Sequence, residues 1–85
     1  MLKREEIALL SSGGGCLGKA ADDEPIFTLR GQDLLAAQLV RDWADLLEVR
    51  SIATGAMTKE RIEKIKEARE LASRMDAWPT RKLPD

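Results

Sequence analysis

Apolar residues recur at helical spacing through the second half of the chain. Over residues 34–50, one predicted helix face is formed by Leu35, Leu39, Trp43 and Leu46. Three neighbours widen this stripe, Ala36, Val40 and Leu47, and the opposite face holds Gln38, Arg41, Asp45 and Glu48. Asp33 precedes the helix as a favourable N-cap residue. The pattern therefore predicts an amphipathic helix that buries its leucine and tryptophan stripe.

A second apolar stripe follows after a short turn over residues 51–57, which contains Gly55. Thr58 is a favourable N-cap residue, and Glu60 stands in the first turn, where the helix dipole favours an acidic side chain. The stripe comprises Ile62, Ile65, Ala68, Ala72 and Met75. Pro79 ends the helix. Two such helices joined by a short turn predict an antiparallel helical hairpin.

The patterns before residue 31 are weaker. Residues 3–10, KREEIALL, favour a short helix, and IALL alone also fits a short strand. The glycine-rich segment 11–18 predicts a loop that continues to Pro25. Residues 26–30, IFTLR, predict one short strand. This strand needs a partner, either residues 6–10 or another copy of the chain.

The predicted fold is a single small domain over residues 1–85, mostly α within the α+β class. It is an antiparallel helical hairpin with an N-terminal glycine-rich loop and one short strand. Residues 1–12 are expected either to dock on the core or to form a loose arm, and residues 79–85 form a polar tail. A chain of 85 residues with one cysteine and no histidine has a small core and no disulfide or tetrahedral zinc site to stabilise it. We therefore expect a homo-oligomer.

The charge pattern narrows the classes of partner. The net charge is −1, with 14 basic and 15 acidic residues interleaved along the predicted helices, so no basic face is offered to nucleic acid. No apolar run approaches the length of a membrane span, and the N-terminus does not fit a signal peptide. We expect a cytoplasmic protein with no nucleic acid or membrane partner.

The segment GGGCLGKA, residues 13–20, matches two phosphate-binding patterns. Gly13, Gly18 and Lys19 fit G-x-x-x-x-G-K, while Gly13, Gly15 and Gly18 fit G-x-G-x-x-G. The first pattern requires Ser or Thr after the lysine to hold magnesium, and Ala20 stands there. Both patterns require a helix that starts on the loop, and the acidic turn follows too soon for one. The sequence thus argues against a P-loop or a dinucleotide-binding domain.

A simpler anion site is still consistent with this segment. Backbone amides of a glycine-rich loop can form an anion-binding nest, for which Lys19 and Arg30 supply positive charge. The candidate ligand-binding residues are Gly14, Gly15, Cys16, Leu17, Gly18, Lys19, Asp23, Glu24, Arg30 and Asp33. The alternative is that the glycines only shape the loop and that the acidic run from Asp22 to Glu24 is solvated. We expect no cofactor and no metal.

The sequence lacks the combinations of residues that most often carry out catalysis. There is no histidine to activate Cys16, and no pair of carboxylates is singled out by its spacing. We therefore expect a protein that is not an enzyme. Trp43 and Trp78 are interpreted as core or interface anchors.

Two blocks of sequence resemble a known group. They are GCLGKAADDEPIFTLRGQDLLAAQLVRDWA and EARELASRMDAWPTRKLPD, which cover most of the chain after residue 14. They are similar to small, largely uncharacterised proteins encoded by bacteriophages and prophages, whereas the first dozen residues depart from that pattern. The resemblance implies a phage origin and action in a bacterial cytoplasm, and it transfers no catalytic residues.

Two functional hypotheses follow from the sequence. In the first, the glycine-rich loop binds a small phosphate-bearing molecule, such as a nucleotide signal, and sequesters it to counter or modulate host processes. In the second, the helical hairpin and Trp78 form a protein-interaction module that binds and inhibits a host protein.

Overall fold

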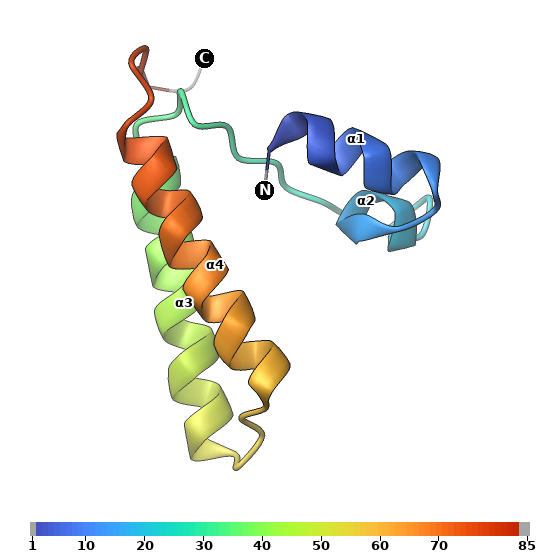
Figure 1. Cartoon of the computed structure of the whole chain (residues 1–85), viewed down its shortest axis with the longest axis vertical. Coiled ribbons are helices and arrows are strands. Elements are labelled where there is room, and N and C mark those ends of the chain that lie inside the picture. Colours follow the sequence, from blue (N-terminus) through green and yellow to red (C-terminus); the bar gives the residue numbers. More distant parts are fainter. Residues whose placement is uncertain (1, 84–85) are drawn as a thin grey trace.

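The computed structural model of the protein describes residues 2–83 and contains four helices within that range. Their bounds are α1 Lys3–Ser11, α2 Gly15–Lys19, α3 Ala36–Ala53 and α4 Lys59–Asp76. Helices α3 and α4 run antiparallel and pack along their length, which confirms the predicted helical hairpin (Figure 1). The shorter helices α1 and α2 pack on each other at the other end of the chain (Figure 1).

The α3–α4 interface is built from small side chains. On α3, Ala37, Ala44 and Ser51 recur every seven residues and are buried together with Ala36. On α4, the buried residues are Ile65 and Ala72, also seven residues apart. Because alanine and serine have short side chains, the two helix backbones can approach closely along this seam. The described residues include no large side chain that is fully buried.

The structure corrects the predicted core stripe of α3. Leu35, Leu39, Trp43 and Leu46 are exposed, with Leu39 at 44% and Leu46 at 58%. The residues predicted only to widen the stripe lie nearer to α4, since Ala36 is buried and Val40 and Leu47 are half-buried. The helix therefore turns its small-residue side toward α4 and its large-residue side outward.

The charged residues predicted for the solvent face of α3 lie along the edge of the interface. Arg69 of α4 donates hydrogen bonds to Asp45 at 2.9 Å and to Glu48 at 3.4 Å. Arg41 of α3 pairs with Asp76 at the far end of α4. These pairs cross from one helix to the other, so the edge of the hairpin is held by ionic contacts rather than by apolar ones.

The ends of the two long helices follow local chemistry. The Thr58 hydroxyl accepts a hydrogen bond from the Arg61 amide at 3.1 Å, which confirms the predicted N-cap of α4. The α3 helix begins later than predicted, because the Asp33 carboxylate accepts from the Leu35 amide at 2.8 Å and shapes a preceding turn. Ser51 belongs to α3 and not to the turn, which contains Gly55 at φ +67°.

The predicted strand over residues 26–30 is wrong. These residues adopt no regular secondary structure, and Phe27 is 83% exposed. Residues 6–10, its predicted partner, form part of α1, so the segment has no neighbouring strand to complete its hydrogen bonds. Within the described residues, strand-like pairing occurs instead at one parallel bridge, between Asp33 and Lys82.

That bridge ties the C-terminal tail to the start of α3. The Lys82 amide donates to the Gln32 carbonyl at 2.7 Å, and the Leu34 amide donates to the Lys82 carbonyl at 2.9 Å. The predicted tail over residues 79–85 therefore docks at residue 82, while positions 84–85 lie outside the described residues. Likewise, residues 2–12 of the predicted arm contain helix α1, and position 1 is outside that range.

Candidate functional site

The glycine-rich segment forms a helical turn rather than the predicted loop. After α1 ends, Gly13 adopts φ +78° and its amide donates to the Leu10 carbonyl, which is a typical helix C-terminal arrangement. Gly15, at φ +72°, starts the five-residue helix α2, which contains Cys16, Leu17, Gly18 and Lys19. The predicted ligand-binding residues Gly14 to Lys19 therefore lie on a short α1–α2 hairpin.

Two of these glycines have structural roles that need no ligand. A Cβ atom on Gly18 would lie 2.9 Å from the Gly13 carbonyl carbon, so only glycine permits α2 to approach the end of α1 this closely. A Cβ atom on Gly15 would lie 3.2 Å from the Leu9 Cβ, and its positive φ also favours glycine. The spacing of these glycines is thus explained by packing of the hairpin.

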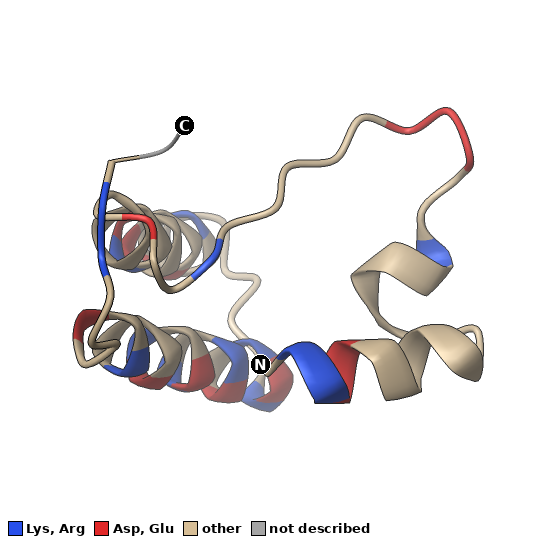
Figure 2. Cartoon of the chain, turned by 90° about the horizontal axis from the view of Figure 1, so that it is seen from above, with Lys and Arg blue, Asp and Glu red and all other residues tan. Residues whose placement is uncertain are grey.

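The charged members of the predicted ligand site are spread along the chain. Lys19 ends α2, the acidic run Asp22–Glu24 forms an outer bend, and the chain then extends past Arg30 toward α3 (Figure 2). Glu24 accepts a hydrogen bond from the Ala21 amide, a contact within the bend itself. Within residues 2–83, no hydrogen bond or ion pair joins the side chains of Lys19 and Arg30 to the bend.

Asp33 and Cys16 also have local explanations. The Asp33 carboxylate caps the turn before α3, and the Cys16 thiol is free and exposed. No group of three potential metal-ligating side chains occurs in the described part of the chain. The candidate ligand-binding residues thus contribute to turns, helix packing and an acidic bend.

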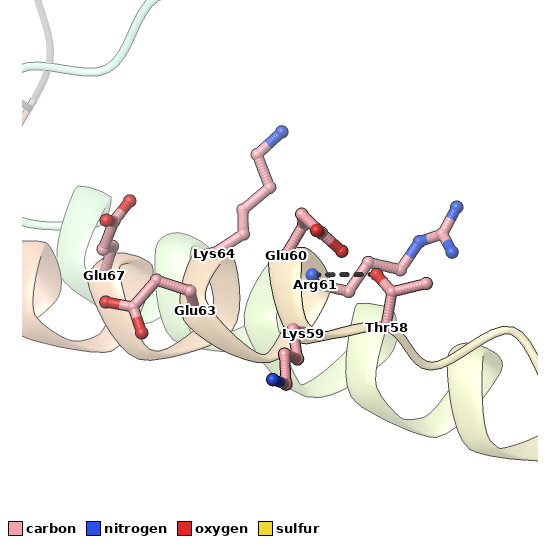
Figure 3. A pocket seen from close by; sticks show the side chains of 7 residues that line it. All are labelled: Thr58, Lys59, Glu60, Arg61, Glu63, Lys64 and Glu67. Carbon is pink, nitrogen blue, oxygen red and sulfur yellow. Dashed lines mark hydrogen bonds between the residues drawn. The ribbon is translucent and has the colours of Figure 1, made fainter.

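A surface depression lies on α4, away from the residues predicted to bind a ligand. It is lined by Thr58, Lys59, Glu60, Arg61, Glu63, Lys64 and Glu67. The labelled side chains leave α4 in several directions and do not converge on one point (Figure 3). Their charges alternate, as expected for a solvated helix face. This depression has no arrangement of groups that selects a ligand.

The most distinctive surface is the outward face of α3. The exposed apolar side chains on the side of α3 that faces away from α4 form a surface that we call the outer α3 face. These are Leu35, just before α3, and Leu39, Trp43, Leu46 and Val49 within it, exposed by 44% to 63%. Together with Asp42 between Leu39 and Leu46, and Ala53 after Val49, the leucine and valine positions form a row with alternate spacings of four and three residues. This spacing is typical of a helix that packs against another helix.

The outer α3 face accounts for part of an unusually large exposed surface. The chain of 9.4 kDa exposes 6845 Å², whereas a compact monomer of this mass exposes about 5,000 Å². Its radius of gyration is 14.1 Å, compared with about 12 Å for a compact domain of this length. The α1–α2 hairpin contributes to the excess as well, because neither helix contacts α3 or α4 within residues 2–83.

A signal in the sequence does identify this surface. Helix α3 carries two stripes that can pack against another helix, one of large apolar residues and one of small residues, with Ala37, Ala44 and Ser51 at seven-residue spacing. Helix α4 has one apolar stripe, rich in alanine, and its other faces are charged. A hairpin of two helices can cover only one stripe of α3, and the small residues suit the close contact with α4.

Comparison with known proteins adds no relative: no family model matched the chain, and neither curated proteins nor solved structures gave a significant match.

In residues 2–83, the helices lack the combination of length and apolar character that a membrane crossing requires.

Proposed function

We propose that this chain is a non-enzymatic protein-interaction module and that the outer α3 face is its docking surface. The proposal depends on one observation: α3 exposes a continuous row of leucine, tryptophan and valine side chains opposite the face that packs on α4. The largest exposed apolar patch of a monomeric protein is often a functional surface. Tryptophan is also enriched among the residues that dominate binding energy, which gives Trp43 a central role.

The partner is a protein that offers a complementary apolar helix face. Helix-in-groove and helix-on-helix recognition both use anchors spaced by three and four residues, as on the outer α3 face. The alternating charges of α4 provide a solvated surface on the other side of the hairpin.

Site-specific photo-crosslinking tests the proposal. A photo-reactive phenylalanine analogue replaces Leu46 on the outer α3 face or, as a control, Lys66 on the exposed side of α4, and the full chain is irradiated in the cells that express it. We expect protein adducts from position 46 and none above background from position 66. Equal adduct patterns at the two positions would overturn the docking role of the outer α3 face.

The hypothesis of a phosphate-bearing ligand stays a prediction, and calorimetry tests it separately. The wild-type chain is titrated with a panel of nucleotides, next to the variants Lys19→Ala and Arg30→Ala. Heat with the wild type that disappears in both variants would support the ligand site at the α1–α2 hairpin. Absence of heat for every nucleotide would leave the interaction module as the only function with structural support.

A further inference from the structure

We infer that the outer α3 face pairs with the same face of a second copy, with the two α3 helices antiparallel. This inference rests on the proposed function and names the partner. The resulting assembly is a four-helix bundle of two hairpins, in which each α3 helix packs on its own α4 and on the partner's α3 helix.

The first argument is the size of the chain's own core. Among residues 2–83, the buried apolar residues are Ala36, Ala37, Ala44, Ile65 and Ala72, a set with one large side chain. Small domains with so little buried surface usually need a disulfide, a metal or association with another chain. The chain has one cysteine and no histidine, so association is the available means.

The second argument is the area of the outer α3 face. If a fully exposed aliphatic side chain contributes about 100 Å² and a tryptophan about 200 Å², the exposed fractions of the five side chains give roughly 310 Å² of apolar surface per copy. Homodimer interfaces are about 65% apolar, so two such faces correspond to roughly 950 Å² of total buried surface. A specific interface needs about 1,000 Å². Two copies of this face therefore form an interface of about the smallest size that specific association requires.

The third argument is the match between the two halves of the face. Suppose that two copies run antiparallel and cross at the level of residue 44 along α3. Leu39 then lies opposite Val49 of the other copy, and Leu35 lies opposite Ala53. In the middle, Leu46 lies opposite Asp42 of the other copy. Each leucine and the valine of the face then has an opposite residue, Trp43 lies at the flank of this row, and a two-fold axis relates the contacts.

Charge selects the antiparallel arrangement. Parallel pairing would bring the two Asp42 carboxylates together in the middle of an apolar face, where like charges repel. Antiparallel pairing places each Asp42 opposite a leucine, and Arg50 of the other copy lies one helical turn further on. A long arginine side chain spans that distance, so the one acidic residue of the seam gains a cationic neighbour.

The first measurement is the mass of the full chain across a concentration series, by light scattering or sedimentation. We expect the mass to rise from 9.4 kDa toward twice that value, and Leu46→Glu to remain monomeric at every concentration. Ile62→Glu is the matched control, because Ile62 is 56% exposed and lies on α4, compared with 58% for Leu46. A wild-type chain that stays monomeric, or a dimer that tolerates Leu46→Glu, would overturn the inference.

The second measurement is cysteine crosslinking, with Cys16→Ser in every chain. A mixture of Leu39→Cys and Val49→Cys chains should form a mixed disulfide, whereas each alone should not, because its two thiols are about 15 Å apart along the antiparallel pair. Self-crosslinking of Leu39→Cys alone would establish parallel pairing and refute the antiparallel arrangement. This test still decides the matter if Leu46→Glu fails to fold.

The two proposals fail in different ways. If the wild-type chain stays monomeric while the photo-reactive group at position 46 captures other proteins, the second copy is excluded and the interaction module stands. If position 46 captures nothing and the chain stays monomeric, both proposals fail. Adducts of twice the chain mass, together with the mixed disulfide, support both.

Discussion

The two faces of helix α3 carry different side chains and have different surroundings. The inner face presents Ala37, Ala44 and Ser51 to α4, and Ala44 is fully buried. The outer α3 face presents leucine, tryptophan and valine to solvent. The larger apolar side chains are thus on the exposed side, which reverses the usual order in a folded domain.

The contrast shows that side-chain size determined which face packs within the hairpin. Two helices pack at the distance that their contact residues allow, and the alanines of α3 and α4 allow a short one. Leucine and tryptophan in the same place would force the helices apart and break the ion pairs between Arg69 and the α3 carboxylates. The large side chains of the outer α3 face are then available to pack against a partner on the side of α3 away from α4.

The largest expected effect comes from truncating Ile65, the large apolar side chain that is buried within the described part of the chain. Ile65 is 3% exposed, so Ile65→Ala should lower the free energy of unfolding by about 2–5 kcal/mol. Ile62→Ala, three residues earlier on α4 at 56% exposure, should cost about 1 kcal/mol or less. Urea unfolding followed by circular dichroism measures both. Equal losses would mean that the inner seam is not the core of the hairpin.

Enlarging the inner face should have the next largest effect. Ala44→Leu places a leucine in a fully buried position, and such overpacking costs about 1–3 kcal/mol. The reverse change on the outer face, Leu46→Ala, should leave unfolding of the dilute chain nearly unchanged and should lower stability only where copies associate, because association stabilises by mass action. The comparison of faces fails if Leu46→Ala destabilises the dilute chain as much as Ala44→Leu.

The sequence allowed the hairpin to be predicted because its signals are local. Periodicity located both long helices, Thr58 marked the start of α4, and Gly55 marked the turn. The sequence did not reveal which stripe of α3 would be buried, because both stripes are apolar at helical spacing. Hydrophobicity alone favoured the leucine stripe, whereas close packing against an alanine-rich α4 favoured the smaller one.

The short helix favoured by residues 3–10 is present as α1, but the strand predicted over residues 26–30 failed because it depended on long-range pairing. Residues 26–30 have strand-like composition, but a strand exists only beside another strand. The partner segment formed α1, where its helix-favouring residues dominate. The glycine run was predicted as a loop because glycine disfavours helix, and the structure uses Gly13, Gly15 and Gly18 to fold two short helices tightly against each other.

The smallest expected effect concerns the ionic edge between the faces. Arg69→Met keeps much of the aliphatic length and removes the hydrogen bonds to Asp45 and Glu48. All three side chains are exposed by 42% or more, so solvent weakens these pairs, and the loss of stability should be smaller than for Ala44→Leu. The loss is measured as the difference in free energy of unfolding between wild type and Arg69→Met at about 0.01 M and at about 1 M salt, because the screening length falls from about 30 Å to about 3 Å.

The pH dependence of the free energy of unfolding distinguishes this ionic edge from a site that titrates near neutral pH. Hydrogen bonds to Asp45 first, and to Glu48 second, raise the pKa of Arg69 above its usual value. A raised pKa on a cation contributes stability that is complete below the unfolded-state pKa and is lost only in strongly alkaline solution. The difference between wild type and Arg69→Met should therefore stay constant between about pH 6 and pH 9. A difference that persists unchanged in high salt would show that the short-range hydrogen bonds of Arg69, and not its screened charge, stabilise this edge.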